Sequence, residues 1–217
     1  LNNKNIRLNY SYAHLKSNRP SFILFTSGST GEPKGIVHST GGYLVYTKYT
    51  CIKKFNISDK KIILTASDAG WINGHTYALY GPLSLGATTI LLEKPIILLN
   101  KNILREVLLE LKVNILYLPV TLIRLIKSLK NKSKVKFKNL NLLGSMGEPL
   151  SKYTGSWFSK SFSLKKLQIV NTYFQTETAG IISSPSFKDK ISNVPLGTVG
   201  KPITKYFTHN YCRSCGW

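Results

Sequence analysis

Short apolar runs alternate along this chain with longer stretches in which apolar residues recur at helical spacing. Glycine, proline, asparagine or serine stands at most of the joins. Most of the short runs are continuously apolar, which is typical of strands that helices cover on both faces. Strands are predicted at residues 22–25, 35–38, 61–65, 88–92, 114–118, 140–143 and 168–171, and helices at 42–55, 75–83, 101–111, 121–129 and 151–158. This order predicts an α/β fold, a layered and mostly parallel sheet flanked by helices.

The loop after the first predicted strand reads Thr-Ser-Gly-Ser-Thr-Gly-Glu-Pro-Lys-Gly over residues 26–35. Its glycines let backbone N–H groups approach an anion, its hydroxyls donate hydrogen bonds, and Lys34 supplies a positive charge. The spacing differs from that of the P-loop, because Pro33 precedes the lysine and a glycine follows it. A polyphosphate-binding loop of another type is therefore predicted. Its residues are Thr26, Ser27, Gly28, Ser29, Thr30, Gly31 and Lys34.

Further motifs follow this loop. They are AGWINGH from Ala69, YGPL from Tyr80, GATT from Gly86, GSMGEPL from Gly144 and NTYFQTETAG from Asn171. Together with TSGSTGEPKG they resemble the adenylate-forming enzymes, which include acyl-CoA synthetases, luciferases and peptide-synthetase adenylation domains, and most closely the acetyl-CoA synthetase branch. The similarity extends from about Pro20 to Ile203. The resemblance implies that residues 1–203 are part of the large N-terminal AMP-binding domain of such an enzyme.

In that family a carboxylate attacks the α-phosphate of ATP to give acyl-AMP and pyrophosphate, and the thiol of coenzyme A then displaces AMP. The resemblance implies that the β- and γ-phosphates are held by Ser27, Gly28, Ser29, Thr30 and Lys34. The other implied nucleotide-binding residues are Gly147, Glu148, Pro149, Asn171, Thr172, Tyr173, Phe174, Gln175 and Thr176. Both segments follow predicted strand ends, where open α/β sheets place ligands.

Lys34, Thr176 and Glu177 are the predicted catalytic residues. By the resemblance, Thr176 contacts the α-phosphate and Glu177 binds Mg²⁺, a hard cation that prefers carboxylate oxygen. The family usually has aspartate where Asn171 stands. Asparagine keeps an acceptor oxygen for the adenine but removes the charge.

The residues expected to line the acyl pocket are Trp71, Ile72, Met146 and Phe174. Acetate-using relatives have tryptophan where Phe174 stands, so the smaller ring opens space, and Met146 refills part of it with a flexible thioether. We therefore expect a short-chain acid, such as acetate, propionate or a slightly larger or branched one. Asn73 replaces a threonine that contacts coenzyme A in relatives, and the alternative interpretation is a polar cap of the helix that follows. His75 is expected to be structural, because adenylation of an ionised carboxylate needs no base.

The strong positive charge suggests nucleic acid or anionic lipid at first sight, because 30 Lys and Arg stand against 9 Asp and Glu. Lysine accounts for 25 of these 30 residues, whereas nucleic-acid surfaces favour the arginine fork. The basic run at residues 127–138 is therefore interpreted as a solvated loop. No apolar run reaches the roughly 18 residues of a membrane span. Together with the small number of cysteines, this predicts a cytoplasmic protein. The family resemblance implies that the chain binds a small carboxylate, ATP and coenzyme A, and no nucleic acid is expected.

The ends of the chain suggest a fragment, because residue 1 is leucine and the sole methionine is Met146. We expect the C-terminal lid domain of the family, with its adenylation lysine, to be absent, and the isolated chain to be inactive or weakly active. Residues 204–217 are interpreted as a truncated or aberrant tail. The tail holds Cys212, Cys215 and His209, three candidate ligands where a structural zinc site needs four, so no metal is expected there.

Two other functions fit the same motifs. One is an adenylating enzyme that uses a longer acid or passes the acyl group to a carrier protein. The other is a non-catalytic nucleotide-binding remnant, which the lack of an adenylation lysine in the complete gene would favour.

Overall fold

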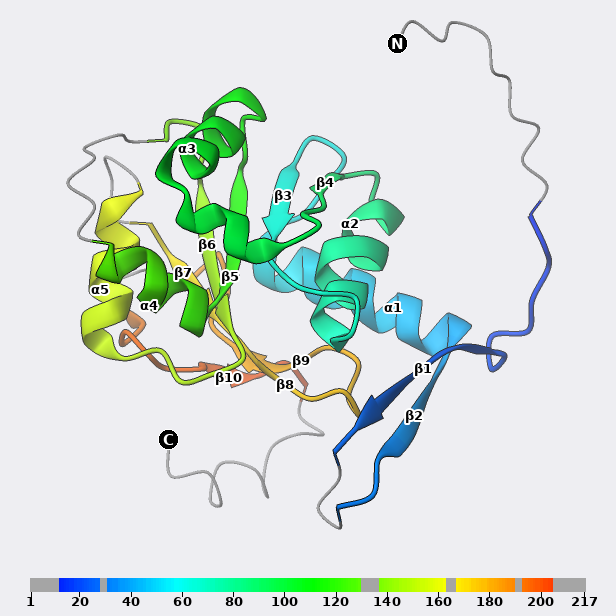
Figure 1. The fold of residues 1–217 in the computed structure, drawn as a ribbon. Helices are drawn as coiled ribbons and strands as arrows, with labels where there is room; N and C mark the ends of the chain where they lie inside the picture. The colour runs from blue at the N-terminus through cyan, green and yellow to red at the C-terminus, as the bar shows by residue number, and fades with distance from the viewer. Residues whose placement is uncertain (1–11, 28–30, 130–136, 163–166, 190–192, 205–217) are drawn as a thin grey trace, which may run out of the picture.

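The computed structural model describes residues 12–27, 31–129, 137–162, 167–189 and 193–204 of this α/β chain. A five-stranded parallel sheet lies at the centre in the order β4-β3-β5-β6-β7 (Figure 1). Its strands are β3 (Ile62–Thr65), β4 (Thr88–Ile90), β5 (Ile115–Pro119), β6 (Leu142–Met146) and β7 (Ile169–Asn171). The mostly parallel sheet predicted from the apolar runs is therefore confirmed.

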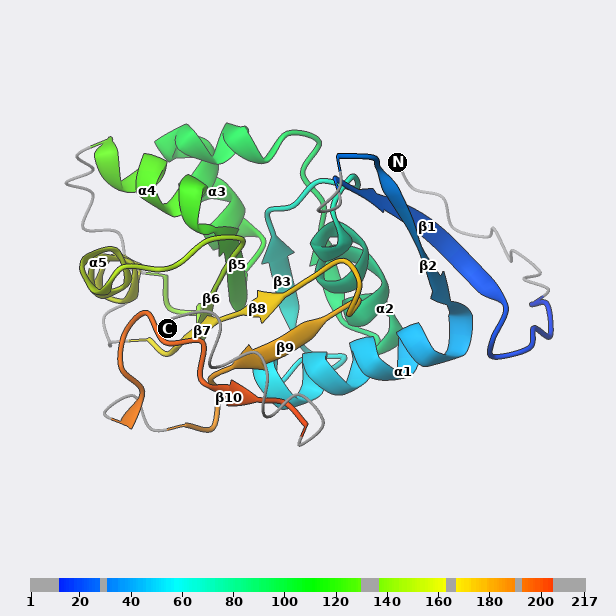
Figure 2. The ribbon, with the colours of Figure 1, turned by 90° about the horizontal axis from the view of Figure 1, so that it is seen from below.

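Alternate strand residues point to opposite faces of this sheet, and each face has its own core. Leu64, Leu116 and Leu143 belong to a cluster with residues of α3, α4 and α5, whereas Ile63 and Ile115 belong to a second cluster. The helices are α1 (Thr40–Thr50), α2 (Gly81–Ser84), α3 (Lys101–Glu110), α4 (Val120–Ser128) and α5 (Lys152–Ser161). Figure 2 shows α3 and α4 on one side of the sheet and α1 on the other. Burial on both faces explains why the central strands are continuously apolar.

The first two strands form a separate antiparallel hairpin instead of joining the parallel sheet. They are β1 (Pro20–Thr26) and β2 (Lys34–Ser39), and the phosphate-loop motif connects them. One face of the hairpin is open, because Ile23 and Phe25 are 53% and 71% exposed. The sequence predicted both strands, and their pairing with each other is a finding of the structure.

A third, three-stranded sheet was not predicted. It has the order β10-β9-β8 and consists of β8 (Tyr173–Phe174), β9 (Ile181–Ser184) and β10 (Lys201–Pro202), all antiparallel. Two of its strands have only two residues each, too few to form an alternating or apolar run. This sheet matters for the site, because Gln175–Thr178, the QTET part of the last motif, lies between β8 and β9. We call this segment the QTET turn.

Two predicted helices and one predicted strand differ in detail from the structure. The helix predicted at 42–55 begins at Thr40, and its last turn, Cys51–Phe55, is π-helical. The helix predicted at 75–83 is π-helical over Gly74–Tyr80 before it continues as α2. The strand predicted at 140–143 lies at Leu142–Met146, which places Met146 inside β6. A short 3₁₀ helix, Pro95–Leu99, precedes α3. Among the described residues, no helix is long and apolar enough to cross a membrane.

Candidate functional site

The two predicted nucleotide-binding segments leave neighbouring strands at the same edge of the sheet. β6 and β7 pair in parallel, with Ser145 opposite Asn171, so the chain continues from both strand ends side by side. Gly147 follows β6 with a φ of 83°, a left-handed conformation that favours glycine, and open space lies where a Cβ would be. The arrangement is the one that the sequence predicted for ligand-binding segments of an open α/β sheet.

The Gly147–Pro149 segment is attached to the start of α4. The Glu148 carboxylate accepts a hydrogen bond from the Thr121 hydroxyl, and Arg124 Nη1 lies 2.8 Å from Glu148 Oε2. Arg124 also donates to the Pro149 carbonyl at 3.3 Å. Glu148 therefore anchors the segment to a helix, and the Gly147–Pro149 segment is exposed.

The side chains of Asn171 and Thr172 point into the protein. Asn171 Oδ1 accepts a hydrogen bond from the Ser145 hydroxyl at 2.9 Å, and its Nδ2 donates to the carbonyls of Gly197 and Thr198 at 3.1 and 3.2 Å. The Thr172 hydroxyl lies 2.6 Å from the Tyr117 hydroxyl. Both residues are buried. Their side chains are thus satisfied by protein partners, in contrast to the adenine contact predicted for the Asn171 oxygen.

The residues after them are more open. Tyr173, Phe174, Gln175 and Thr176 are half-buried, and Glu177 is exposed. Within the described parts of the chain, the Glu177 carboxylate forms no salt bridge. It is therefore available to a cation.

The turn around Glu177 is held by its own hydrogen bonds and by a neighbouring helix. The Thr178 hydroxyl accepts from the Gln175 N–H at 3.2 Å and lies 2.9 Å from the Gly180 carbonyl. The Thr76 hydroxyl donates to the Ala179 carbonyl at 2.6 Å. These contacts fix the ends of the turn while leaving Glu177 at its surface.

The inner face of the hairpin is the one that packs against the rest of the protein, and it continues to the phosphate-loop motif that connects the two strands. Directly opposite residues of two antiparallel strands share a face, and Phe22 lies opposite His38 while Thr26 lies opposite Lys34. Phe22 packs against the core cluster that contains Ile72. The face that includes Thr26 and Lys34 is therefore the inner one. Ser27 is exposed and Gly31 has a φ of 85°, and the predicted contacts Gly28, Ser29 and Thr30 lie outside the described residues.

Sequence reasoning missed His38, which is buried on the inner face of the hairpin. His38 is 6% exposed, and its ring centroid lies 5.0 Å from that of Phe22. Burial lowers the pKa of His38, while the backbone of Thr176 and the charge of Glu177 act in the opposite direction. The alternation of β2 could have identified it, since it shares a face with Lys34.

Three of the four predicted acyl-pocket residues come together. Phe174 packs against both the cluster that contains Met146 and the cluster that contains Ile72, and the latter two residues are buried. Trp71 belongs to neither cluster and is 69% exposed. The reason is a tight turn, in which the Trp71 N–H donates to the Asp68 carbonyl and directs Ile72 inward. Of the four residues predicted for the acyl pocket, Ile72, Met146 and Phe174 therefore lie together and Trp71 does not.

Asn73 is buried without a protein partner. It is 3% exposed, and among the described residues neither its Oδ1 nor its Nδ2 has a hydrogen-bond partner. It precedes the π-helical segment Gly74–Tyr80 but makes no side-chain cap, so the helix-cap interpretation is wrong. His75 Nε2 lies 2.8 Å from the Ala69 carbonyl and its ring stacks on Phe22, contacts typical of a structural residue.

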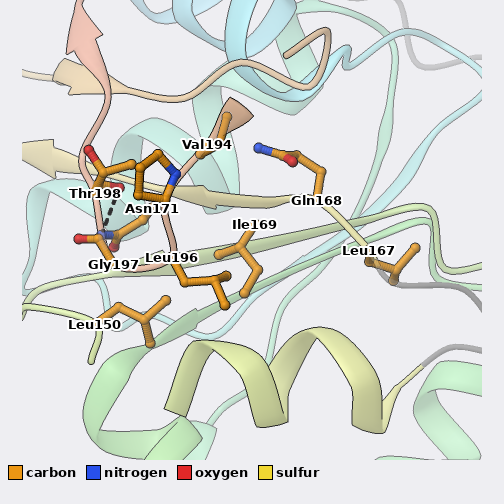
Figure 3. Close-up of a pocket in the computed structure, with 10 residues that line it drawn as sticks. Leu150, Leu167, Gln168, Ile169, Asn171, Val194, Leu196, Gly197 and Thr198 are labelled. Atoms are coloured by element: carbon orange, nitrogen blue, oxygen red, sulfur yellow. Dashed lines mark hydrogen bonds between the residues drawn. The ribbon is translucent and has the colours of Figure 1, made fainter. Parts of the chain in front are cut away.

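A small pocket lies beside β7 rather than at the QTET turn (Figure 3). It is lined by Leu150 before α5, by residues in and just before β7, and by the segment 194–198. None of these residues is charged. In Figure 3, Asn171 points toward Gly197 and Thr198, the segment that covers this edge of the sheet. The pocket therefore offers no charged side chain to a phosphate. Within the described ranges, no group of three His, Cys, Asp or Glu could hold a metal, and Cys212, Cys215 and His209 lie outside them.

The chain matches known proteins over most of its length. The family model for AMP-binding enzymes matches residues 3–208. The acetyl-coenzyme A synthetase of Vibrio vulnificus (strain YJ016) is 42% identical over 173 residues, which are 79% of this chain and 27% of that protein. The acetyl-coenzyme A synthetase of Cronobacter sakazakii (strain ATCC BAA-894) is 41% identical over 168 residues, or 76% of this chain and 26% of that protein. The chain thus spans about a quarter of the length of these curated relatives.

The fold has a counterpart among solved structures. The anthranilate CoA ligase AuaEII in complex with anthranoyl-AMP has a TM-score of 0.76 at 21% identity, covering 89% of this chain and 36% of that one. Its similarity supports the arrangement of sheets described above. With the family model matching residues 3–208, the chain belongs to the AMP-binding enzyme family.

Proposed function

We propose that this chain provides the nucleotide- and acid-binding core of an ATP-dependent acid:CoA ligase. In this proposal residues 1–203 are part of the large AMP-binding domain, and the enzyme converts a short-chain carboxylate to acyl-AMP and then to its CoA thioester. The observation that carries the proposal is the parallel pairing of Ser145 with Asn171. It places the Gly147–Pro149 segment beside the segment that leads to Glu177, as two segments that bind one nucleotide must lie.

The phosphates would be held from two directions. The hairpin contributes Lys34 and Thr26 from its inner face, with Ser27 next to them, and the QTET turn contributes Thr176. Positioned donors and a positive charge stabilise the negative charge that develops on departing pyrophosphate. The backbone around Gly147, together with Tyr173, would contact the adenosine. Asn171 and Thr172 support these residues from below through their own hydrogen bonds.

Glu177 fits the role of a magnesium ligand. Its carboxylate is exposed and, among the described residues, free of salt bridges. Mg²⁺ is usually held by one or two carboxylates together with substrate phosphates, so Glu177 needs no further protein ligand. When bound there, the ion would neutralise phosphate charge during attack by the carboxylate.

The acid would lie against Ile72, Met146 and Phe174. All three are apolar, and the first two are 3% exposed. An apolar wall of this kind would favour a short acyl chain. Each additional methylene would change the kcat/KM for the acid by roughly 10–200-fold. Acetate and propionate are the proposed substrates, in keeping with the acetyl-CoA synthetases to which the chain is similar.

The thiol arm of coenzyme A would meet Asn73. A buried carboxamide with both polar atoms unpartnered among the described residues costs free energy until a ligand or water satisfies it. The amide of a pantetheine arm offers one donor and one acceptor, which matches Asn73. The reactants are thus a carboxylate, ATP and coenzyme A, and a cytoplasmic location fits a chain with three cysteines.

The product of the complete gene should be assayed for acid-dependent ATP–pyrophosphate exchange with acetate, propionate, butyrate and longer acids, with and without coenzyme A. Exchange with the shortest acids and acyl-CoA formation are the expected results. Exchange without acyl-CoA would favour transfer to a carrier protein, and a preference for longer acids would favour the second enzyme interpretation. No exchange with any acid would contradict the ligase and leave the nucleotide-binding remnant.

A further inference from the structure

The Tyr117 hydroxyl contacts one of the two proposed nucleotide-binding segments at Thr172, although no sequence motif assigns it a role. Tyr117 is on β5 and is fully buried against Phe55, with ring centroids 4.9 Å apart. Its hydroxyl lies 2.6 Å from the hydroxyl of Thr172, which directly follows β7. A buried phenol needs a partner for its O–H, and this partner belongs to a segment at the site.

The direction of this hydrogen bond follows from counting protons. The Thr172 hydroxyl donates to the Ser145 carbonyl at 2.9 Å, and a hydroxyl has only one proton to donate. The Tyr117 hydroxyl must therefore be the donor to Thr172. Burial raises the pKa of Tyr117, which keeps the proton in place.

The same network continues into the edge of the sheet. The Thr172 N–H also donates to the Ser145 carbonyl, at 2.9 Å, and the Ser145 hydroxyl donates to Asn171. Asn171 in turn donates to the carbonyls of Gly197 and Thr198. Hydrogen bonds thus connect the end of β6, the end of β7 and the 197–198 segment. Tyr117 is the first donor in this network.

We infer that Tyr117 is a positioning residue for ATP, which sets the location of the Tyr173–Glu177 segment relative to Gly147 by donating to Thr172. It does not touch the substrate and acts only through that hydroxyl. The inference rests on the proposed function, because ATP binding is the property that this geometry serves. It goes beyond that function by assigning a role to a residue of the sheet interior.

Tyr117→Phe tests the inference because it removes one oxygen and keeps the ring in its packed place. It should raise the KM for ATP by about 3–10-fold, since a buried hydrogen bond contributes about 1 kcal/mol. The KM for the acid should change by less than about twofold. Hydrogen exchange of the amides in residues 173–177 should become faster than in the unmodified protein. Ser159→Ala is a matched control, because it removes another buried hydroxyl, which donates to the Leu167 carbonyl at 2.6 Å, at the opposite end of β7 from Thr172.

A substitution of Thr172 separates positioning from general destabilisation. Thr172→Val removes the acceptor of the Tyr117 hydroxyl and should raise the KM for ATP at least as much as Tyr117→Phe does. The double variant should be no worse than Thr172→Val alone, because the Tyr117 hydroxyl acts only through that of Thr172.

Several results would overturn the inference. They are an unchanged KM for ATP in Tyr117→Phe, an effect no larger than that of Ser159→Ala, or additive effects in the double variant. If the unmodified protein catalyses exchange, these results overturn the inference alone and leave the proposed function intact. If it catalyses none, the proposed function fails, and unchanged hydrogen exchange at residues 173–177 in Tyr117→Phe then also excludes the positioning role.

Discussion

The Ser145 hydroxyl on β6 donates a 2.9 Å hydrogen bond to the Asn171 carboxamide on β7, between two residues that lie in direct register. The other end of the carboxamide donates to the carbonyls of Gly197 and Thr198. Asparagine is suited to this position because it has both an acceptor and two donors. An aspartate, usual here in the family, would offer acceptors only.

Asn171→Asp should therefore destabilise the protein by about 1–3 kcal/mol at pH 7, because it places a buried carboxylate beside two carbonyl oxygens. Urea unfolding of the two proteins measures the difference in free energy of unfolding. Asn141→Asp, the same change at an exposed position, is the control and should shift it by less than about 0.5 kcal/mol. Equal losses at both positions would contradict the role given to the Asn171 amide.

The sequence was sufficient to predict the parallel sheet but not the orientation of Asn171. The run from Ile115 to Leu118 is apolar because helices or loops cover both faces of β5, a cause that is visible in the sequence alone. The partners of Asn171, in contrast, come from residues 26 and 27 positions later in the chain, and no local pattern predicts such a pairing.

The site could be predicted in part for the same reason. Motif spacing correctly located the residues that follow β6 and β7, because strand ends determine their place. The exposure of Trp71, the burial of His38 and the Tyr117 network depend on tertiary packing. Spacing along the chain carries no information about these contacts.

Lys34→Ala should reduce the kcat/KM for pyrophosphate exchange by about 100-fold or more, because it removes a positive charge from the phosphate site. The free energy of unfolding should stay within about 0.5 kcal/mol, since Lys34 is exposed at the start of β2. Lys60→Ala, at another exposed lysine in a turn, is the control for loss of charge. Equal kinetic losses in both variants would indicate a general electrostatic effect instead of a specific site.

Arg124→Ala should raise the KM for ATP by several-fold while changing the free energy of unfolding by less than about 1 kcal/mol. The reason is that the Arg124–Glu148 pair is partly exposed, at 49% and 40%, so it contributes little to stability but attaches the Gly147–Pro149 segment to α4. Arg105→Ala, an exposed arginine on α3, should change neither quantity. An unchanged KM for ATP in Arg124→Ala would show that this attachment is dispensable for the nucleotide.

The raised pKa of the Tyr46 hydroxyl leads us to expect a loss of stability at alkaline pH. Burial raises its pKa to about 12, and its hydroxyl donates to the Ile181 carbonyl at 2.7 Å. A group whose pKa is raised in the folded state contributes stability that is complete below the unfolded pKa and is lost as the pH rises through the folded value. Between pH 10 and about 12, the free energy of unfolding of the unmodified protein should therefore fall more steeply with pH than that of Tyr46→Phe. Identical slopes in denaturant titrations across this range would contradict the prediction.

Acetate-dependent ATP–pyrophosphate exchange in the product of the complete gene, compared with its Glu177→Gln variant at saturating Mg²⁺, tests the ligase assignment most directly. Glutamine keeps the size of the exposed side chain and removes its charge, so folding should be unaffected. We expect exchange in the unmodified protein and a loss of about 100-fold or more in Glu177→Gln. No acid-dependent exchange in the unmodified protein, or equal exchange in both proteins, would contradict the assignment.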